Sequence, residues 1–491
     1  MSVIKVENLT FSYPSSYDNI FENVSFQIDT DWKLGFIGRN GRGKTTFLKL
    51  LQGKYEYRGK IISAVQFDYF PYIVPDKTIL TEEVLQSVCP AAEEWQIMRE
   101  LMLLDVDCEV LYRPFNTLSN GEQTKVLLAA LFLNEGHFLL IDEPTNHLDT
   151  QARQIVSEYL RKKKSFILVS HDRSFLDGCV DHILSLNRTN IEVQSGNFSS
   201  FMENFERQQD YERKQSDRLQ TDIKRLQKTA RQTSVWAERT EASKNEKNSG
   251  LRPDKGFIGH KAAKMMKRAK VVEARQQREI EEKAELLKNT EIESSLKLSP
   301  LAYRAERLAA FSLVTPVYDG KEICAPVTFE IMRGERIALE GKNGSGKSSL
   351  LKLLCGQKIE HTGTISVGAN LIISYVPQDT SRLSGTLTEF ASLHRIDESL
   401  FMAILHKTGI NKSQFDKDIS SFSDGQKKKV LIAKSLCEKA HLYVWDEPLN
   451  FIDVYSRIQI ENLLSEFQPT MIFVEHDKTF QNKIATRIIK L

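Results

Sequence analysis

The stretch GRNGRGKTT, residues Gly38–Thr46, occurs a second time as GKNGSGKSS, residues Gly341–Ser349. Both copies contain the pattern GxxxxGK[ST], and each lies between an apolar strand-like run and a helix-like run, FLKLL or LLKLL. Glycines let the backbone wrap around phosphate groups with its N–H groups at a helix N-terminus. One match could be a chance glycine-rich turn. Two matches in the strand-to-helix context predict two phosphate-binding loops.

Three further segments repeat in the same order, which indicates a tandem duplication. The pairs are LSNGEQTKVLLA with FSDGQKKKVLIA, FLLIDEPTNHLD with LYVWDEPLNFID, and FILVSHDRSF with IFVEHDKTF. Apolar strands alternate with helical stretches in both copies, so each is expected to be an α/β domain around a largely parallel sheet. We predict two tandem P-loop nucleoside-triphosphatase domains, residues 1–204 and 300–491, joined by a helical linker, residues 205–299.

Each repeat carries groups suited to magnesium. A hydroxyl residue follows the loop lysine, and an aspartate ends the apolar run before Glu-Pro. Hydroxyl and carboxylate oxygens of this kind hold Mg²⁺ beside the phosphates of a nucleotide. The predicted magnesium ligands are Thr45 and Asp142 in the first copy and Ser348 and Asp446 in the second.

Each aspartate is followed by a glutamate placed to polarise an attacking water, and a histidine follows the next strand. A pair of carboxylates at a strand end can simply be solvated, and a lone histidine is usually structural. The matched positions in a repeat favour catalysis instead. The predicted catalytic residues are Glu143, Glu447, His171 and His476.

The segments LSNGEQ and FSDGQ resemble the signature loop of ATP-binding cassette (ABC) proteins, and with the other motifs the resemblance covers essentially the whole chain. In that family two cassettes face each other head to tail, so each ATP lies between one phosphate loop and the opposite signature. The resemblance implies ATP and Mg²⁺ as ligands. Site one is expected to comprise Gly38, Asn40, Gly41, Gly43, Lys44, Thr45 and Thr46 with Ser423, Gly425 and Gln426. Site two is expected to comprise Gly341, Asn343, Gly344, Gly346, Lys347, Ser348 and Ser349 with Ser119, Gly121 and Glu122.

The resemblance also implies an aromatic residue stacked on adenine near the start of each cassette. Tyr13 is the candidate in the first copy, and Tyr318 is a less securely placed candidate in the second. The family further has a glutamine after the strand that follows the phosphate-loop helix. The second copy has Gln378 there, which the family would use as a magnesium ligand, whereas the first copy has Tyr72.

The loop that ends each Asp-Glu segment differs as well, with Phe451 in the second copy where the first has His147. A tyrosine cannot supply the amide oxygen that Gln378 offers. Unequal hydrolysis at the two sites is therefore expected, although both sites keep the Asp-Glu pair and the histidine.

The linker consists of two breaker-free runs around the segment NSGLRPDKGFIGH, which predicts two long helices with a tip near residues 243–260. About 14 Lys or Arg face about 4 Asp or Glu between Lys224 and Lys270, a pattern suited to RNA phosphates. A solvated coiled-coil spacer is the alternative interpretation. The predicted RNA, tRNA or drug-site contacts are Lys224, Arg225, Lys228, Arg231, Lys244, Lys264, Lys267 and Arg268, with the aromatics Trp236 and Phe257. Packing of Trp236 against the opposite helix remains equally open.

Two fused cassettes with a charged helical linker are similar to the ABC-F subfamily, whose members act on ribosomes. GRNGRGKTT, LYRPF (Leu111–Phe115) and GFIGHKAAKMMKRAK (residues 256–270) resemble the Lsa-type resistance members. This resemblance implies a bacterial 70S ribosome as partner, with contacts to 23S rRNA and the peptidyl-site tRNA from the exit site. It also implies protection from lincosamides, streptogramin A and pleuromutilins. Alternatives are a housekeeping translation factor, an exporter ATPase and a DNA-repair ATPase.

The composition is ordinary for a globular chain of 491 residues, at 41% hydrophobic and 27% charged with a net charge of +2. The basic linker is therefore a local feature. No apolar run of about 18 residues predicts a membrane helix, and the N-terminus has no signal-peptide core. The six cysteines are scattered without paired spacing. A cytoplasmic protein without disulfides is expected.

Overall fold

The computed structural model describes residues 2–14, 19–134, 136–146, 148–186, 191–208, 298–410 and 414–491, with seven further single positions between 210 and 228. The chain forms two compact units, Met1–Phe201 with Ser295–Leu491, and Met202–Ser294. Both repeat copies belong to the first unit. The linker boundaries at 205 and 299 remain predictions.

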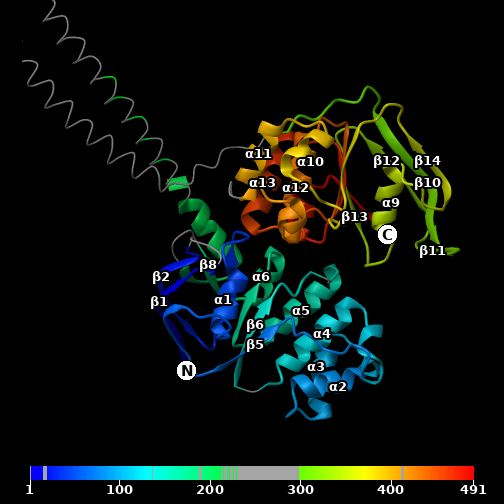
Figure 1. Ribbon diagram of the computed structural model, residues 1–491. Helices are drawn as coiled ribbons and strands as arrows, with labels where there is room; N and C mark the ends of the chain where they lie inside the picture. The colour runs from blue at the N-terminus through cyan, green and yellow to red at the C-terminus, as the bar shows by residue number, and fades with distance from the viewer. Residues whose placement is uncertain are drawn as a thin grey trace, which may run out of the picture. The chain divides into compact units, whose positions relative to one another are not determined.

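The first copy is built on a six-stranded sheet of order β5-β6-β7-β3-β8-β9 (Figure 1). Its neighbouring strands run parallel except β9, which pairs antiparallel with β8. The strands are β3 (Lys33–Gly38), β5 (Gln66–Phe70), β6 (His137–Asp142), β7 (Phe166–Val169), β8 (His182–Leu186) and β9 (Ile191–Ser195). All four residues of β7 are buried, as expected for a central parallel strand covered on both faces.

Helices and a small antiparallel sheet complete the first copy. The sheet has the order β2-β1-β4, with β1 (Val3–Phe11), β2 (Phe21–Asp29) and β4 (Arg58–Ile62). The helices are α1 (Lys44–Leu51), α2 (Thr81–Val88), α3 (Glu94–Leu103), α4 (Asn120–Leu131), α5 (Thr150–Lys162) and α6 (Arg173–Cys179), with 3₁₀ turns at Cys108–Tyr112 and Phe115–Thr117. Helix α4 starts at the signature segment and is buried from Thr124 to Leu131, so its first turn has a fixed position.

The second copy repeats this plan with a five-stranded parallel sheet of order β15-β16-β17-β13-β18. Its strands are β13 (Arg336–Glu340), β15 (Ile373–Val376), β16 (Leu442–Asp446), β17 (Met471–Val474) and β18 (Arg487–Lys490). Its antiparallel sheet consists of β10 (Arg307–Tyr318), β11 (Lys321–Glu322), β12 (Val327–Met332) and β14 (His361–Val367). Its helices are α9 (Lys347–Leu354), α10 (Leu387–Leu393), α11 (Glu398–Lys407), α12 (Asp424–Cys437), α13 (Val454–Phe467) and α14 (Lys478–Ile484), with a 3₁₀ turn at Ile419–Ser421.

The order β5-β6-β7-β3-β8 in the first copy corresponds strand for strand to β15-β16-β17-β13-β18 in the second. This match confirms the predicted tandem α/β architecture. The phosphate loops lie at the carboxyl ends of β3 and β13, and the Asp-Glu pairs at the ends of β6 and β16. No helix in the described part of the chain is long and apolar enough to cross a membrane.

Of the predicted linker contacts, Arg225 and Lys228 are described, and both are exposed helical positions. The tip and the other predicted contacts lie outside the described residues. These are Lys224, Arg231, Trp236, Lys244, Phe257, Lys264, Lys267 and Arg268.

Candidate active sites

The first phosphate loop connects β3 to α1 and folds back on its own lysine. Gly43 has a φ of 101°, and a Cβ added there would lie 2.5 Å from Ile20 Cγ2, so a larger residue does not fit. Lys44 Nζ donates hydrogen bonds to Gly38 O at 2.8 Å and to Asn40 Oδ1 at 3.3 Å. Burial lowers the pKa of Lys44, while the charges of Asp453 and Glu143 act in the opposite direction. The loop thus holds a buried amine at a helix N-terminus, which suits a phosphate.

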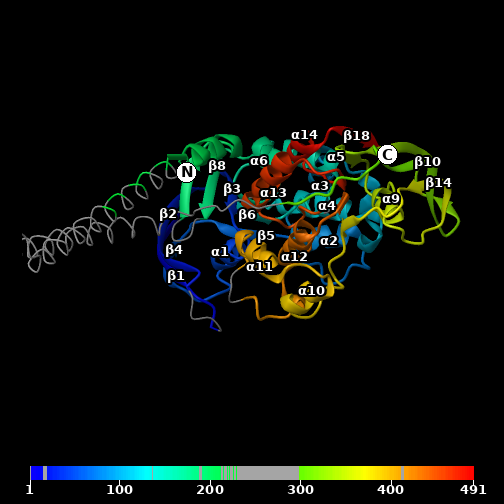
Figure 2. The same ribbon diagram turned by 90° about the horizontal axis from the view of Figure 1, so that it is seen from above.

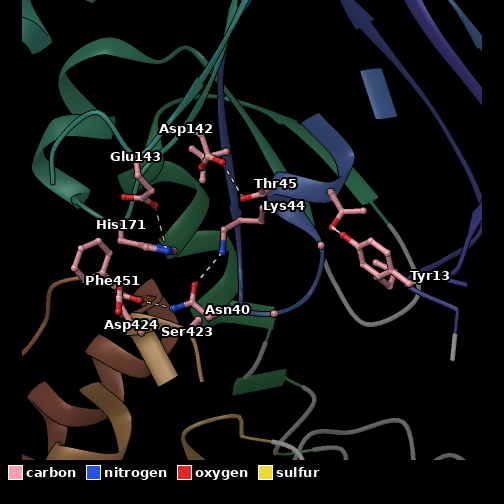
Figure 3. Close-up of a pocket in the computed structure, with 16 residues that line it drawn as sticks. Tyr13, Asn40, Lys44, Thr45, Asp142, Glu143, His171, Ser423, Asp424 and Phe451 are labelled. Carbon is pink, nitrogen blue, oxygen red and sulfur yellow. Dashed lines mark hydrogen bonds and ion pairs between the residues drawn. The ribbon is translucent and has the colours of Figure 1, made fainter. Parts of the chain in front are cut away.

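This loop opens on a cavity of about 510 Å³ that both copies line (Figure 3). The first copy contributes Tyr13, the phosphate loop, Asp142, Glu143 and His171, and the second contributes Ser423, Asp424, Gly425 and Phe451. Asn40 joins the two halves directly, since its Nδ2 donates to Phe451 O at 2.5 Å and its backbone N–H to Asp453 Oδ2 at 3.4 Å. Most residues that the sequence assigned to site one line this cavity, with Gly38 and Gln426 as the exceptions.

Helix α12 presents the signature of the second copy to this cavity. Ser423 is its N-cap and accepts a hydrogen bond from the Gln426 backbone N–H, while the Gln426 side chain accepts one from Ser423 N. This reciprocal capping fixes the first turn of the helix. Gln426 thus stabilises the first turn of α12 through its hydrogen bonds with Ser423, whereas Ser423 and Gly425 line the cavity.

The predicted magnesium groups of the first copy contact each other. Thr45 Oγ1 donates to Asp142 Oδ2 at 2.8 Å, and Tyr69 Oη donates to the same oxygen at 3.0 Å. Among the described residues no cluster of three or more His, Cys, Asp or Glu could hold a metal ion. A carboxylate and a hydroxyl beside a phosphate loop fit Mg²⁺, which takes few protein ligands and completes its shell with phosphate and water oxygens.

The second copy repeats this pair, with Ser348 Oγ donating to Asp446 Oδ1 at 3.0 Å. Asp446 Oδ2 is buried and has no hydrogen-bond partner, so it remains available to accept a cation. Burial raises the pKa of Asp446 to about 6. An isolated buried carboxylate oxygen is costly, and a bound cation would remove that cost.

In both copies the glutamate and the histidine that are predicted to be catalytic lie next to each other. His171 Nε2 lies 3.3 Å from Glu143 Oε1, and His476 Nε2 lies 3.4 Å from Glu447 Oε1. Both glutamates have positive φ values, 52° and 46°, which non-glycine residues rarely adopt. Backbone bonds to Val169 O and Val474 O, at 2.9 and 3.0 Å, hold the two residues in this conformation. Such strain at matched positions is typical of functional sites.

The surroundings of the two glutamates differ. Burial, and then the charge of Asp142, raise the pKa of Glu143 to about 8. Burial would also raise the pKa of Glu447, but the hydrogen bond and charge of His476 and the hydrogen bond of Gln378 outweigh it and lower that pKa. The structure thus supplies a physical reason for the predicted inequality of the two sites.

Gln378, the predicted magnesium ligand of the second copy, contacts Glu447 through its amide nitrogen, and coordination of Mg²⁺ by its amide oxygen remains a prediction. Its Nε2 donates to Glu447 Oε2 at 2.8 Å, and Asn450 Nδ2 donates to the same oxygen at 2.7 Å. In the first copy Tyr72 is half-buried, and the hydroxyl that reaches the metal-binding carboxylate belongs to Tyr69. His147, the other residue in the predicted asymmetry, lies outside the described residues.

The tyrosines predicted to stack on adenine have matching contacts. Tyr13 Oη and Thr46 Oγ1 hydrogen-bond each other at 2.9 Å, and Tyr318 Oη and Ser349 Oγ do so at 3.1 Å. Tyr13 also packs edge-on against Phe11 and Tyr55. Tyr318 is exposed whereas Tyr13 is half-buried, and stacking on adenine remains a prediction for both.

At site two, the phosphate-loop lysine repeats the first. Lys347 Nζ donates to Gly341 O at 2.8 Å and to Lys342 O at 2.7 Å. Burial lowers the pKa of Lys347, and the charge of Asp149 from the first copy opposes this shift. Asp149 therefore lies near the second loop as Asp453 lies near the first. The assignment of Ser119, Gly121 and Glu122 to site two remains a prediction.

Sequence reasoning missed three contacts at these sites. They are the Tyr69 hydroxyl on Asp142, the Asn450 amide on Glu447, and the Asn40 side chain on Phe451 O. The first had a usable signal, because YFPY and YVPQ place tyrosines at matching positions, Tyr69 and Tyr375. The others depend on loop conformation, which the sequence does not reveal.

A model of the ABC transporter family matches residues 21–146 and 324–450. The chain belongs to this family. Both matched segments contain a phosphate loop and an Asp-Glu pair, so the ABC ATPase domain occurs twice. The protein is accordingly an ATP hydrolase, and the cavity of site one is the candidate ATP-binding site.

Relatives resemble this ABC protein along nearly its full length. It is 27% identical to ribosome protection protein VmlR of Bacillus subtilis (strain 168), over 96% of this chain and 84% of VmlR. It is 28% identical to ATP-binding protein Uup of Caulobacter vibrioides, over 96% of this chain and 74% of Uup. It is 25% identical to ABC transporter F family member 2 of Arabidopsis thaliana, over 100% of this chain and 76% of that protein.

Solved structures share the tandem fold. The archaeal ribosome recycling factor aABCE1, in complex with the ribosomal stalk protein aP1, matches with a TM-score of 0.63 at 19% identity. The match covers 98% of this ABC chain and 87% of that one. The RNase-L inhibitor matches with a TM-score of 0.62 at 19% identity, over 99% and 87% of the two chains. These likenesses confirm the fold alone.

Proposed function

We propose that this ATPase is an ABC-F protein of the antibiotic-resistance, Lsa-like type, which works in the cytoplasm on the bacterial 70S ribosome. It enters the exit site, and its linker reaches towards the peptidyl-transferase centre, where lincosamides, streptogramin A and pleuromutilins are displaced. The observation that carries the proposal is the cavity in which Ser423 and Gly425 of one copy face the phosphate loop of the other. A nucleotide bound there touches both copies, so its presence or loss can move them and the segment between them.

ATP holds the copies together because both of them contact its terminal phosphate. Lys44 and the N–H groups of the phosphate loop bind the β- and γ-phosphates, and the N-terminus of α12 with Ser423 receives the γ-phosphate. When bound, Mg²⁺ would be held by Thr45 and Asp142, where it neutralises charge on the phosphate oxygens. Hydrolysis removes the group that both copies share, and the contact between them weakens.

Glu143 and His171 have different roles in the proposed hydrolysis. Glu143, at the end of β6, orients a water molecule and accepts its proton. His171 lies 3.3 Å from Glu143 and lines the same cavity, so it can bond the γ-phosphate and hold the glutamate in place. Burial and the charge of Lys44 keep the pKa of His171 well below its usual range, which favours the neutral ring.

The linker supplies the proposed ribosomal contact. Its lysines and arginines between Lys224 and Lys270 suit RNA phosphate grooves of 23S rRNA and the peptidyl-site tRNA, and Trp236 and Phe257 could stack on bases. The relative VmlR, which is named a ribosome protection protein, aligns over 96% of this chain, including the linker. That alignment favours a ribosomal partner over a membrane partner.

A housekeeping translation factor that relieves stalled ribosomes is the second candidate function. The observation that favours it is that Uup and the Arabidopsis F family member, whose names carry no protection role, match about as well as VmlR. Drug susceptibility of cells with and without the gene separates the two functions. Resistance confined to drugs of the large subunit supports protection, whereas slow growth without drug supports the housekeeping role.

The proposal is tested with the E143Q/E447Q variant, in which both predicted bases are lost and the bound ATP persists. With ATP it should co-sediment with 70S ribosomes and inhibit translation, whereas with ADP it should not. The wild-type protein under the same conditions is the control. Equal sedimentation with ATP and ADP, or none at all, would refute the ribosomal role.

A further inference from the structure

Arg173 lies two residues after the catalytic histidine of the first copy and reaches into the second copy. Its guanidinium makes a bidentate ion pair with Glu461 of α13. Nη1 lies 3.2 Å from Oε2, and Nη2 donates to Oε1. Nη2 also donates to Asp477 Oδ2 at 3.4 Å. Asp477 directly follows His476, the catalytic histidine of the second copy. One side chain thus joins the two histidine segments, His171–Arg173 and His476–Asp477.

The acceptors of Arg173 are deeply buried. The side chains of Glu461 and Asp477 are each 1% exposed, and that of Arg173 is 11% exposed. Buried bidentate guanidinium–carboxylate pairs have a defined geometry and are costly to break, because the carboxylates then lack a counter-charge. Figure 2 shows α6 and α14, which begin at Arg173 and Lys478, next to each other at this contact.

From Asp477 the contacts continue to both active sites. Arg457 Nη1 donates to Asp477 Oδ2 at 3.4 Å, and the same guanidinium donates to Leu449 O and Ile452 O, each at 2.9 Å. The loop between those carbonyls carries Asn450, which bonds Glu447 of site two. It also carries Phe451, whose carbonyl accepts the Asn40 amide of site one.

Within the part of the chain that the structure describes, the second copy makes no equivalent ion pair to the first copy. Lys478 occupies the place of Arg173 in the second copy and is exposed, and Ser157 occupies the place of Glu461 in the first. Arg153 does pair with Asp172 at 2.9 Å, as Arg457 pairs with Asp477, but within the described residues no ion pair joins Lys478 to the first copy. The two copies have therefore kept each internal pair, but at this contact the ion pair that joins the copies comes from the Arg173 side, beside a hydrogen bond between the Ser174 and Thr479 hydroxyls at 3.1 Å.

We propose that Arg173 is a positioning residue that makes hydrolysis at one ATP site depend on the state of the other. The pair with Glu461 and Asp477 ties any shift of the His171 segment to the N-terminus of α14. There Asp477 Oδ1 accepts the backbone N–H groups of Thr479 and Phe480 at 2.9 and 3.1 Å. His476 immediately precedes this cap, so a shift at site one is transmitted to the Glu447–His476 pair at site two. Arg173 is not among the residues that line the cavity of site one.

The test compares ATP turnover of the wild type with the sum of the turnovers of E143Q and E447Q, each of which keeps one active site. Independent sites give a ratio of one, and we expect the wild-type ratio to differ from one by at least about fivefold, the usual scale of allosteric coupling. In the R173Q background, the same ratio compares R173Q with the sum of R173Q/E143Q and R173Q/E447Q, and it should be close to one. R173Q/E461Q should resemble R173Q, because both changes break the same connection.

K478Q is the matched control, and it should leave the ratio at the wild-type value. R173K keeps the charge but loses the bidentate geometry, so it should give an intermediate ratio. It also serves as the second variant if R173Q does not fold. A purely structural Arg173 would lower both turnovers and leave the ratio unchanged. That result, or a wild-type ratio of one, overturns the proposal.

Discussion

Tyr69 and Tyr375 occupy matching positions in the two copies, but only one has a partner. Tyr69 Oη donates to Asp142 Oδ2 at 3.0 Å, whereas Tyr375 Oη is buried without a hydrogen-bond partner. A tyrosine that orients a metal-binding carboxylate should matter, since such supporting bonds fix the ligand. Y69F should therefore raise the Mg²⁺ concentration needed for half-maximal hydrolysis at site one by about 2- to 10-fold, the equivalent of one hydrogen bond.

The measurement uses the E447Q background, in which only site one hydrolyses ATP. Y375F in the E143Q background is the matched control, and it should leave the Mg²⁺ dependence of site two unchanged. If Y69F and Y375F have equal effects, the contact with Asp142 has no specific role.

Glu100 makes the stability of the first copy depend on pH. It is 1% exposed and accepts hydrogen bonds from Tyr159 Oη at 2.6 Å and Lys163 Nζ at 2.5 Å. Burial would raise the pKa of Glu100, but the bonds from Lys163 and Tyr159 outweigh it and lower that pKa. A lowered pKa means that the stabilisation is complete above the ordinary glutamate pKa and is lost as the pH falls through the folded-state value.

E100Q should accordingly cost about 1.5–3 kcal/mol at pH 7, the range for a hydrogen bond to a charged group. Thermal unfolding of wild type and E100Q, followed from pH 7 down to pH 4, provides the check. The difference in melting temperature should narrow towards the acidic end. A constant difference, or one that widens on acidification, would contradict the assignment.

At the scale of elements, the two signature helices carry their first-turn carboxylate at different positions, Glu122 in α4 and Asp424 in α12. Glu122 of α4 accepts bonds from both the backbone N–H and the Oγ of Ser119 at 2.8 Å, and Gln426 replaces it in α12. If Ser119 and Glu122 complete site two, this carboxylate lies near the γ-phosphate and repels it. E122Q keeps the hydrogen bond to Ser119 and removes the charge.

E122Q should tighten ATP binding at site two by about 2- to 5-fold, in line with a single charge at a helix N-terminus. The KM for ATP measured in the E143Q background reports on site two, and the E447Q background reports on site one as the control. An effect confined to site one would reverse the predicted pairing of loops and signatures.

Some elements could be predicted from the sequence because their residues are neighbours in the chain. Gly43 and Lys44, or Asp142 and Glu143, form a strand-end or loop motif whose chemistry depends on local spacing. The pairing of Lys44 with Ser423 came from the family resemblance instead. Arg173 and Glu461 are 288 positions apart, and no local pattern relates them. Gln378 belongs to a recognisable motif, but the contact of its amide nitrogen with Glu447 depends on loop conformation and does not follow from that motif.

At the scale of the whole molecule, charge is distributed unevenly. The chain has a net charge of +2, yet the linker between Lys224 and Lys270 is strongly basic. Reversal of Lys264, Lys267 and Arg268 to glutamate should weaken ribosome binding and flatten its dependence on salt, since fewer counterions are released. Sedimentation with 70S ribosomes across a salt series measures both effects. Reversal of the exposed Lys162 and Lys164 in the first copy is the control.

The most direct test of the account removes the predicted linker tip, residues 243–260, and replaces it with a short Gly-Ser turn. The truncated protein should keep its ATP turnover in solution, because both ATP sites belong to the other compact unit. We expect cells that carry it to lose survival on lincosamides, streptogramin A and pleuromutilins, and the purified protein to bind ribosomes more weakly. Full drug survival and unchanged ribosome binding after the truncation would contradict the claim that ATP moves this basic segment into the ribosome.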